Sequence, residues 1–514
     1  MGAVSSSVVM ALIFLIMLLS RLMLSQTLAP LRVDLTEWKI LPTGEIVSCP
    51  EKRRGIQMED WRTQRGFHAL TQLYRREDLQ RTIPYTTEYY RLQDVEFNEN
   101  FKDIRSSGKL IDSNSSPWEK DVASLLAFKQ SIQIDPLSVL ANWTIGKNSD
   151  HCRTWTGVTC NKKHQVTKIS LPGLQLNGTI TPMIGDLAYL SYLNLSSNNF
   201  NGEIPLELMN CHSLSTLDLS VNLLGGQLPP QLGKLSQLNV LWLSHNSFSG
   251  FIPASLGKCH NLTSMDLSHN NLSGSIPAAF GELRQLQELW LENNHLAGSI
   301  PTQLGLLNQL QSLALMNNGL TGPIPSSLGN CTSLVHLLLG NNELTGAIPV
   351  EFGQLSLIQE MGLEYNGALG GPVPGFLSNC SQLQILFLGA CNFTSIALEI
   401  WSMTSLRQLA LFSNSLTGEL PLEVGNCTGL RWLDLGWPQN NLTGSIPKTL
   451  GNLKDLITLN LIQNSFTGGI PSELGSLPQL TKLLLDRNSG LGGPIPQNLA
   501  SYRNFSHLSW GHVT

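Results

Sequence analysis

The sequence predicts an α/β solenoid built around one long parallel β-sheet, and three observations support this prediction. One short apolar pattern recurs fourteen times between residues 166 and 504, ten times in units of 24 residues. Within each unit apolar and polar residues alternate, which is the period of a half-buried strand. A Gly and a Pro follow at fixed offsets in most units. Internal repeats of about 20 to 50 residues are typical of stacked arrays in which no unit is stable alone.

The chain begins with a predicted secretory signal peptide, residues 1–26. Val8 to Leu19 is an unbroken apolar run, shorter than the roughly 20 residues that a membrane span needs. The alternative is N-myristoylation, because Gly2 and Ser6 fit that pattern. With a net charge of −5, the composition indicates no general affinity for nucleic acid or anionic membranes.

Residues 27–116 form a charged segment with no repeat. It holds 14 Lys or Arg and 14 Asp or Glu, far denser than the rest of the chain, and a single cysteine, Cys49. The sequence assigns it neither fold nor role. A disordered, lineage-specific insertion and a gene-model artefact are the two explanations, and we favour the second.

The repeated units start at Val166 and then at every 23 to 26 residues up to Leu480, and each reads L-x-x-L-x-L-x-x-N-x-L-x-G-x-I-P. The leucines of the alternating part point into a core, and the residues between them face solvent. Twelve units carry the Asn, from Asn198 to Asn488. Buried Asn amides must be hydrogen-bonded, so we expect them to form a ladder with backbone groups of adjacent units.

This pattern resembles the plant-type leucine-rich repeat, in which L-x-G-x-I-P adds a short second strand. Twelve units carry G-x-[ILV]-P, for example Gly250–Pro253 and Gly322–Pro325. The resemblance implies a right-handed superhelix with a parallel concave β-sheet, covering fourteen repeats at 166–504. A truncated fifteenth repeat is expected at 505–514.

Residues 117–165 resemble the N-terminal helical cap of plant leucine-rich repeat receptors. The resemblance rests on "WEKDVASLLAFKQSIQIDPLSVLANW" followed by "CRTWTGVTC". It implies a disulfide between Cys152 and Cys160. Five other cysteines, each three residues before a repeat start, replace apolar residues of other units, so we expect buried free thiols. They are Cys211, Cys259, Cys331, Cys380 and Cys427.

Twelve N-x-[ST] sequons predict N-glycosylation of a secreted chain, although Asn- and Ser-rich repeats also generate sequons by chance. The candidates include Asn142, Asn261, Asn392 and Asn441. Only Asn194 falls mid-strand on the open face. A glycan there would block the second repeat.

No catalytic motif and no Cys/His set with metal-ligand spacing occurs in the sequence. His245, His269 and His336 are interpreted as isolated residues on exposed strand positions. We therefore expect no enzyme activity, no metal, no small-molecule cofactor and no nucleic-acid partner. A complete relative could carry a C-terminal Ser/Thr kinase.

Aromatic and apolar residues recur at the solvent-facing strand positions of repeats four to twelve, where a solenoid binds its ligands. Packing between neighbouring strands is the alternative explanation for them. Glu288, Glu292, Glu360 and Glu364 could add acidic edges for a basic group. The apolar candidates are Trp242, Trp290, Met316, Leu338, Tyr365, Ile385, Phe387, Phe412, Trp432 and Trp437.

Arg407 and Arg431 occupy the same position in adjacent repeats. Like charges this close are unfavourable unless an anion or a carboxylate, for which Asp434 is a candidate, compensates. Some peptide receptors of the resembled family hold a peptide's terminal carboxylate with two arginines on one strand. This chain lacks that motif, and the arginine pair is a hypothetical substitute.

The stretch "LGACNFTSIALEIW", residues 388–401, departs from the pattern. Cys391 stands at the Asn-ladder position, Trp401 replaces a Gly and the Gly-x-Ile-Pro is missing. We expect the loss of one rung of the second sheet and a local change of twist around repeats nine to twelve.

These observations favour the extracellular region of a plant cell-surface receptor or receptor-like kinase that binds a secreted peptide or protein. The resemblance implies a co-receptor kinase as a second partner and a location at the plasma membrane or in the apoplast. The alternative is a secreted inhibitor similar to the polygalacturonase-inhibiting proteins.

Overall fold

The structure, a computed structural model, describes residues 38–40, 46–48, 117–145, 150–436, 439–500 and 506–509. The chain divides into two units, Met1–Asn98 and Glu99–Thr514, each described by itself. In the first unit, the described residues form an antiparallel pair, β1 (Trp38–Ile40) and β2 (Ile46–Ser48). The predicted signal peptide and most of the charged segment lie outside the described residues. Among the helices of the described residues, none has the length and apolarity to cross a membrane.

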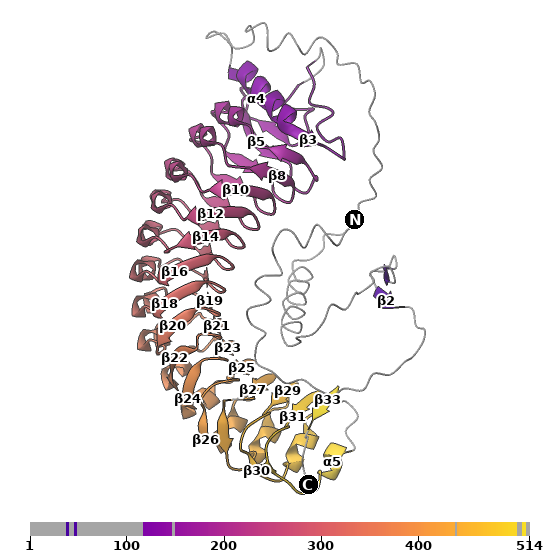
Figure 1. The fold of residues 1–514 in the computed structure, drawn as a ribbon, viewed down its shortest axis with the longest axis vertical. Coiled ribbons are helices and arrows are strands. Elements are labelled where there is room, and N and C mark those ends of the chain that lie inside the picture. Colours follow the sequence, from indigo (N-terminus) through magenta and orange to yellow (C-terminus); the bar gives the residue numbers. More distant parts are fainter. Residues whose placement is uncertain are drawn as a thin grey trace. The chain divides into compact units, whose positions relative to one another are not determined.

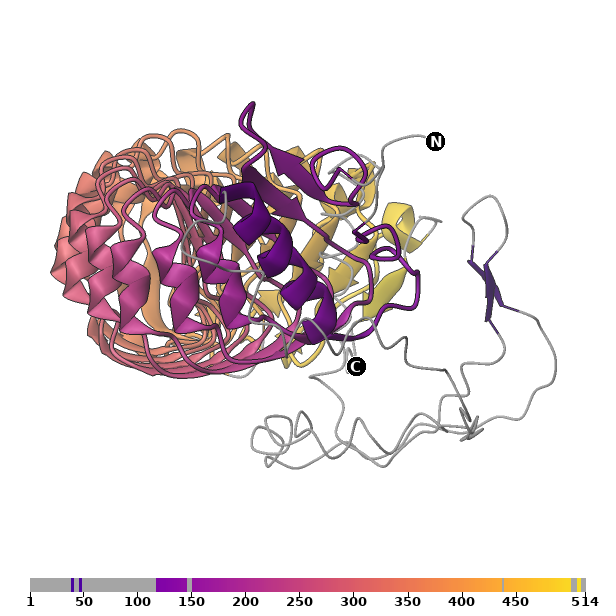
Figure 2. The same ribbon diagram turned by 90° about the horizontal axis from the view of Figure 1, so that it is seen from above.

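The second unit is the solenoid, and the predicted fold class is confirmed. Its repeats stack in chain order, with one long sheet along the inner side of an arc and 3₁₀ turns along the outer side (Figure 1). Figure 2 shows the same stack from above, with helix α4 (Pro117–Ser131) lying across the first repeats.

The cap closes the first end of the hydrophobic core. Leu125 and Phe128 of α4 are buried, and the Phe128 ring lies 5.9 Å from Phe200 of the second repeat. Trp143 and Trp155 stack at 5.4 Å beneath the helix. The cap also adds β3 (Ile132–Ile134) and β4 (Val158–Cys160), which pair antiparallel with the first strands of the two sheets.

The main sheet has sixteen strands, and all pairings after β4–β5 are parallel and in register. Each repeat adds one short strand, which has three residues in every repeat after the first. After β4, the strands are β5 (Val166–Ser170), β7 (Tyr192–Asn194), β9 (Thr216–Asp218), β11 (Val240–Trp242), β13 (Ser264–Asp266), β15 (Glu288–Trp290), β17 (Ser312–Ala314), β19 (His336–Leu338), β21 (Glu360–Gly362), β23 (Ile385–Phe387), β25 (Gln408–Ala410), β27 (Trp432–Asp434), β29 (Thr458–Asn460), β31 (Lys482–Leu484) and β33 (His507–Ser509).

A second sheet of eleven strands runs beside the first and includes β3. The Gly of G-x-I-P lies here at positive φ, +76° at Gly250, a conformation that other residues rarely adopt. Its further strands are β6 (Asn177–Thr179), β8 (Asn199–Gly202), β10 (Leu223–Gln227), β12 (Ser247–Phe251), β14 (Asn271–Gly274), β16 (His295–Ser299), β18 (Gly319–Pro323), β20 (Glu343–Gly346), β22 (Ala368–Val373) and β24 (Asn392–Ile396).

Each repeat returns to the main sheet through a 3₁₀ turn that begins after the Pro of G-x-I-P or its equivalent. The last turn is replaced by a short helix, α5 (Gln497–Ala500). The 3₁₀ turns are η3 (Pro182–Asp186), η4 (Leu206–Asn210), η5 (Pro230–Lys234), η6 (Ala254–Lys258), η7 (Ala278–Glu282), η8 (Thr302–Leu306), η9 (Ser326–Asn330), η10 (Val350–Gln354), η11 (Gly375–Asn379), η12 (Leu398–Ser402), η13 (Leu422–Asn426), η14 (Lys448–Asn452) and η15 (Ser472–Ser476).

One continuous core fills the space between the sheets and turns. The five cysteines that precede repeat starts are buried and unpaired, as predicted, and so is Cys391. Burial raises the pKa of each of these thiols to about 11 or 12, so they stay protonated and act as small apolar groups.

The predicted Asn ladder is also confirmed. The Asn294 amide donates to Leu267 O and Leu291 O at 3.0 and 3.1 Å, and its Oδ1 accepts from Leu272 N at 3.0 Å. Each Asn thus satisfies backbone groups of its own and the preceding repeat. Because an unpaired buried backbone group costs about 1 to 3 kcal/mol, these bonds fix the register of neighbouring units.

Repeats nine to twelve are irregular, and the predicted local change of twist there stays a prediction. The tenth repeat keeps its second strand, β24, without Gly-x-Ile-Pro, so the expected loss of that rung is wrong. Instead the pairing of β22 with β24 shifts register between Gly371 and Pro372, and the second sheet ends at β24. Two separate pairs follow, β26 (Thr417–Glu419) with β28 (Asn441–Thr443) and β30 (Thr467–Gly468) with β32 (Gly490–Leu491).

Trp401 lies in the same repeat as the last strand of the second sheet. It lies in η12, where most units have a Gly packed against the next turn, and it is fully buried. At the equivalent Gly257, an added Cβ would lie 2.4 Å from Ala279 O, so the regular spacing of turns leaves no room for a side chain. An indole at this position therefore requires a different spacing of turns in the tenth repeat.

Candidate ligand-binding surface

The main sheet leaves one face open, and each repeat contributes three outward positions to it. Two lie within the strand on either side of a buried residue, as Val240 and Trp242 do around Leu241, and the third follows the strand. Because the strands are in register, equivalent positions form columns with steps of about 4.8 Å. We call this face the concave surface.

Four aromatic rings from four consecutive repeats lie together on the concave surface. The ring centroids of Tyr365 and Phe412 are 5.8 Å apart, and those of Phe387 and Trp432 are 5.7 Å apart in an edge-to-face arrangement. Tyr365 is 43% exposed, whereas Phe387 is only 9% exposed. Aromatic pairs at these separations attract each other beyond the effect of burial. We call these four residues the aromatic cluster.

Glycines make room for the cluster. A Cβ placed on Gly389 would lie 2.4 Å from Cε1 of Phe412, so the phenyl ring rests directly on the backbone. The carboxyl group of Glu364 likewise lies over Gly340 and Gly362, whose added Cβ atoms would come within 3.0 and 3.1 Å of it. Larger residues at these glycines would displace the side chains that now cover them.

The backbone of the cluster differs from the prediction at two residues. Tyr365 and Phe412 follow strands β21 and β25 rather than lying within them, and Tyr365 has a φ of 59°. Leu338 within β19 and Met316 after β17 are half-buried on the concave surface and extend its apolar part. Trp437, also predicted here, lies outside the described residues.

Trp242 and Trp290 form a separate group, because β17, β19 and β21 lie between them and Phe387. The Trp242 indole donates from Nε1 to Ser264 Oγ at 2.9 Å, and Trp290 donates to Ser312 Oγ at 3.0 Å. Each indole is therefore tied to the strand of the next repeat and is half-buried against the sheet.

The acidic candidates differ in their surroundings. Glu360 Oε2 lies 3.3 Å from Nδ1 of His336. Burial raises the pKa of Glu292 to about 7, with the charge of Asp266 adding to the rise. The Oε2 atom of Glu292 is buried and has no hydrogen-bond partner among the described residues.

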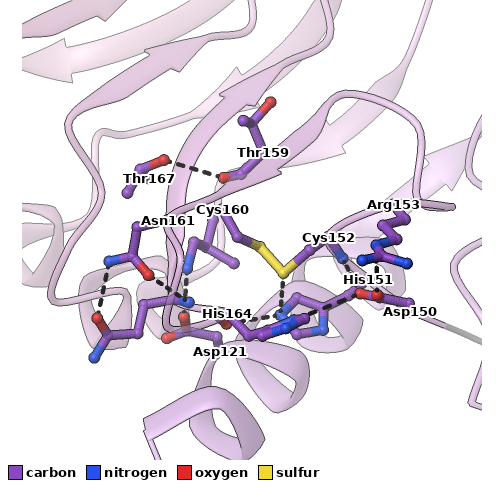
Figure 3. Close-up of a disulfide and its surroundings, with 12 residues drawn as sticks. Asp121, Asp150, His151, Cys152, Arg153, Thr159, Cys160, Asn161, His164 and Thr167 are labelled. Atoms are coloured by element: carbon purple, nitrogen blue, oxygen red, sulfur yellow. Dashed lines mark hydrogen bonds and ion pairs between the residues drawn. A yellow bond between two sulfur atoms is a disulfide. The ribbon is translucent and has the colours of Figure 1, made fainter.

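The cap holds the predicted disulfide between Cys152 and Cys160, shown in Figure 3. Nε2 of His151 lies 3.2 Å from Sγ of Cys152, and the buried His151 has a pKa lowered chiefly by desolvation. Asp150, His151, His164 and the two sulfurs are close enough to resemble metal ligands. However, metals bind thiolates, and both sulfurs are committed to the disulfide.

Below the disulfide, Asp121 of α4 ties the cap to the first repeat. Its Oδ2 accepts a hydrogen bond from Val166 N at 2.7 Å, and burial raises the pKa of this carboxyl to about 6 (Figure 3).

Known families and structures match both parts of this architecture. Residues 119–161 match the leucine rich repeat N-terminal domain family, and residues 189–211, 213–235, 236–296, 308–367 and 455–477 match leucine rich repeat families. The structure of a Leptospira interrogans LRR protein is 30% identical, covering 63% of this chain and 78% of that one at a TM-score of 0.53. This chain belongs to the leucine-rich repeat family.

Its relatives are plant leucine-rich repeat receptor-like kinases. The crystal structure of a TDR receptor is 33% identical, with 66% of this chain and 62% of that chain covered and a TM-score of 0.61. The protein of Arabidopsis thaliana named "Probable LRR receptor-like serine/threonine-protein kinase RPK1" is 35% identical over 20% of this chain and 23% of its own length. The matches thus span less than a quarter of the first curated relatives.

In this leucine-rich repeat chain the two arginines lie at the edge of the concave surface, one residue before β25 and β27. Nη1 of Arg407 donates to Gly429 O at 3.1 Å, and Arg431 is exposed. In the described part of the chain, neither guanidinium takes part in an ion pair. The suggested compensation by Asp434 is wrong, because Asp434 is buried, accepts from Gly436 N and has a pKa raised to about 6 by burial.

The histidine interpretation is also corrected. His245 and His269 are not isolated, since their rings stack with centroids 4.0 Å apart. Both lie after their strands at positive φ, 53° and 52°. Nε2 of His269 lies 3.0 Å from Nδ2 of Asn293, and desolvation, with a smaller effect of His245, lowers the pKa of His269 to about 4.

The predicted glycosylation sites differ in how their amides are used. Asn142 donates to Thr154 O at 2.6 Å and to Thr156 Oγ1 at 2.9 Å, and Asn261 donates to Ser236 O at 3.1 Å. At the other two candidates, Asn392 and Asn441, Nδ2 donates no hydrogen bond to a described residue. Asn392 and Asn441 are exposed, and their side-chain Oδ1 atoms accept hydrogen bonds from Oγ of Ser415 and Ser465.

Two acidic residues beneath or on the concave surface, Asp218 and Asp266, were not predicted from the sequence. Asp218 is only 4% exposed, whereas Asp266 is half-buried. Each occupies the column position held by Trp242 and Trp290, on strands β9 and β13. Both begin the local sequence D-L-S, and this recurrence at one position of the repeat was the available signal.

Proposed function

We propose that this chain is the extracellular ligand-binding region of a plant cell-surface receptor of the leucine-rich repeat receptor kinase class, and that it binds a secreted peptide along its concave surface. The observation that supports this most directly is the aromatic cluster, in which four consecutive repeats each place one ring on an otherwise open sheet. Aromatic side chains are typical anchors of protein interfaces.

The cluster has the dimensions of an extended peptide segment. Four repeats span three steps of about 4.8 Å, roughly 14 Å, which corresponds to about four residues of an extended chain. Packing between strands explains the near-complete burial of Phe387, but it does not explain an exposed Tyr365 beside the half-buried Phe412 and Trp432. We therefore assign Phe387 to the support of the site and the other three rings to ligand contact.

Charged groups at the edge of the cluster would orient the peptide. Arg431 is exposed one residue before β27. Arg407 uses Nη1 for its hydrogen bond to Gly429 O, and the rest of its guanidinium remains available to a ligand. Together they suit a carboxylate of the ligand. Peptide and receptor would then present a joint surface to a co-receptor kinase at the plasma membrane.

The test uses peptides selected from a random display library against the full chain. We expect the selected peptides to lose at least about tenfold in affinity with Tyr365→Ala combined with Phe412→Ala, since each anchor is worth more than about 1 kcal/mol. Phe251→Ala is the matched control, because Phe251 is 73% exposed on β12, away from the concave surface. Equal affinity for both variants would contradict the proposal.

A further inference from the structure

A column of alternating acids and tryptophans crosses the concave surface ahead of the aromatic cluster. Asp218, Trp242, Asp266 and Trp290 occupy equivalent positions on the adjacent strands β9, β11, β13 and β15, and each is paired in register with the next. At steps of about 4.8 Å, Asp266 has an indole-bearing strand on either side. We call these four residues the acidic track.

Hydrogen bonds fix the indoles of the track. Trp242 Nε1 donates to Ser264 Oγ, which in turn donates to Glu288 Oε2 at 2.8 Å. Trp290 Nε1 is bound in the same way to Ser312. Because the polar edge of each ring is satisfied within the sheet, the exposed part of each side chain offers a ligand only the π-face and the carbon edge.

Hydrogen bonds also fix the carboxylates of the track. Oδ1 of Asp266 accepts from N and Oγ of Ser268 at 3.0 and 2.7 Å, and Oδ1 of Asp218 accepts from the equivalent groups of Ser220. Nδ2 of Asn194 donates a hydrogen bond to Oδ2 of Asp218 at 2.8 Å. Oδ2 of Asp266, by contrast, has no hydrogen-bond partner among the described residues.

The negative charge here has no cation to balance it within the described residues. Neither aspartate of the track, nor Glu288 or Glu292, takes part in an ion pair. The lysines and the arginine of these repeats lie on the far side, in or just after the 3₁₀ turns η5, η6 and η7, as Lys234, Lys258 and Arg284. Among the described residues, the stacked His245 and His269 are the imidazoles closest to the track, and His269 interacts with Asp266.

We infer that the acidic track binds a basic side chain, most suitably the guanidinium of an arginine, carried by the peptide ligand. A cation over the face of Trp242 gains a cation–π attraction and meets the open Oδ2 of Asp266 at the same time. A planar guanidinium also stacks on aromatic rings better than an ammonium. Glu292, two residues after Trp290, has a buried Oε2 atom with no hydrogen-bond partner among the described residues.

A divalent metal ion is the competing occupant, and the geometry does not favour it. Among the described residues, the groups of three side chains close enough to ligate one metal all lie in the cap around Cys152. The track offers carboxylates separated by indoles, a spacing that suits a flat organic cation rather than a compact ion.

This inference rests on the proposed function only in taking the ligand to be a peptide, and it predicts the ligand's composition. Asp266 on β13 and Phe387 on β23 are five strand steps apart, about 24 Å, which an extended chain covers in about seven residues. A peptide that occupies both regions therefore carries Arg or Lys about seven residues from an apolar anchor.

The experiment selects random peptides of about 12 residues, long enough for that spacing, against the full chain and titrates the enriched peptides by calorimetry. We expect a basic residue in them and a loss of about tenfold with Asp266→Asn or Trp242→Ala, about 1.4 kcal/mol. Trp242→Phe keeps a ring face and is expected to lose less. Asp455→Asn, which removes an exposed charge just after η14, is the matched control and is expected to change nothing.

A charge swap separates lost recognition from lost folding. An enriched peptide with its Arg replaced by Glu should bind Asp266→Lys better than it binds the wild-type chain. Peptides without a basic residue, or an unchanged affinity in Asp266→Asn, overturn the inference.

The two proposals fail in distinguishable ways. Affinity that depends on Tyr365 and Phe412 but not on Asp266 leaves the peptide site standing without the basic contact. Affinity that depends on Asp266 alone supports the track and contradicts the role of the aromatic cluster. An affinity that depends neither on Tyr365 and Phe412 nor on Asp266 overturns both proposals.

Discussion

The acidic track and the aromatic cluster are built by the same repeat in two different ways. In repeats three to six every unit has 24 residues, the second sheet is continuous, and hydroxyl groups fix the outward side chains, those of the next strand for the indoles and those of the same repeat for the aspartates. In repeats nine to twelve the unit length varies, the second sheet ends, and large rings rest on glycine backbone. Regular geometry thus positions polar groups accurately, whereas irregular geometry makes room for bulky ones.

The largest expected effect concerns Trp401, which belongs to the irregular region. Trp401→Ala should destabilise the chain by about 4 kcal/mol, because it empties a fully buried site between neighbouring turns. Phe251→Ala, at an exposed site of the regular region, should cost less than about 0.5 kcal/mol. Urea unfolding followed by circular dichroism measures both. A cost of Trp401→Ala below that of Phe251→Ala would show that the tenth repeat is not held by this side chain.

A smaller difference is expected between the two residues that fill the ladder position. Asn294→Ala should cost about 3 kcal/mol, since it leaves two carbonyls and one amide without partners in the core. Cys391→Ala should cost about 1 kcal/mol, because its thiol makes only weak bonds to Leu363 O and Gly389 O. Equal losses in denaturant titrations would mean that the ladder is not what distinguishes the regular region.

Glu292 gives the regular region a pH dependence. Its folded-state pKa near 7 exceeds the ordinary value of 4.5, so the folded chain holds a proton that the unfolded chain releases between these values. Its contribution to stability is therefore present below about pH 4.5 and lost as the pH rises to 7, by on the order of 2 kcal/mol.

Glu292→Gln should remove that slope and be more stable than the wild type at pH 8. His269 acts in the opposite direction, because its lowered pKa makes stability rise with pH between about 4 and 6.5. The difference between variant and wild type across a pH series isolates Glu292. A difference that does not vary with pH would contradict the assignment.

The smallest effect on stability is expected in the aromatic cluster itself. Tyr365→Ala removes a side chain that is 43% exposed, and its cost should stay below about 1 kcal/mol. The variant also loses the ring contact with Phe412. A thermal shift assay measures this effect, and a loss as large as that of Trp401→Ala would assign the tyrosine to the core rather than to ligand contact.

The repeat pattern was sufficient to predict the sheet, the core, the Asn ladder and the state of the cysteines. These features depend on spacing along the chain, and spacing is visible in the sequence. Asn294 and Cys211, for example, follow from their place in the unit alone.

The irregular repeats and the partners of charged groups were not predictable in the same way. Whether β24 forms without Gly-x-Ile-Pro depends on the partner strand β22, which absorbs the difference by a register shift at Gly371 and Pro372. The stacking of His245 on His269 and the burial of Asp434 depend on how side chains lean between repeats. The repeat pattern fixes columns of positions but not these directions.

The end of the second sheet at β24 separates a continuous N-terminal part of the array from C-terminal repeats whose second strands form only separate pairs. A repeat array unfolds as one unit only while each interface between neighbours is strong, and the interface between repeats ten and eleven lacks the second ladder of strand hydrogen bonds. The C-terminal repeats should therefore open first and exchange their amide hydrogens faster than the N-terminal ones. Phe387 and Trp432 lie on opposite sides of this interface, so a ligand bound by the cluster would link repeat ten to repeat twelve across it and slow the opening of these repeats.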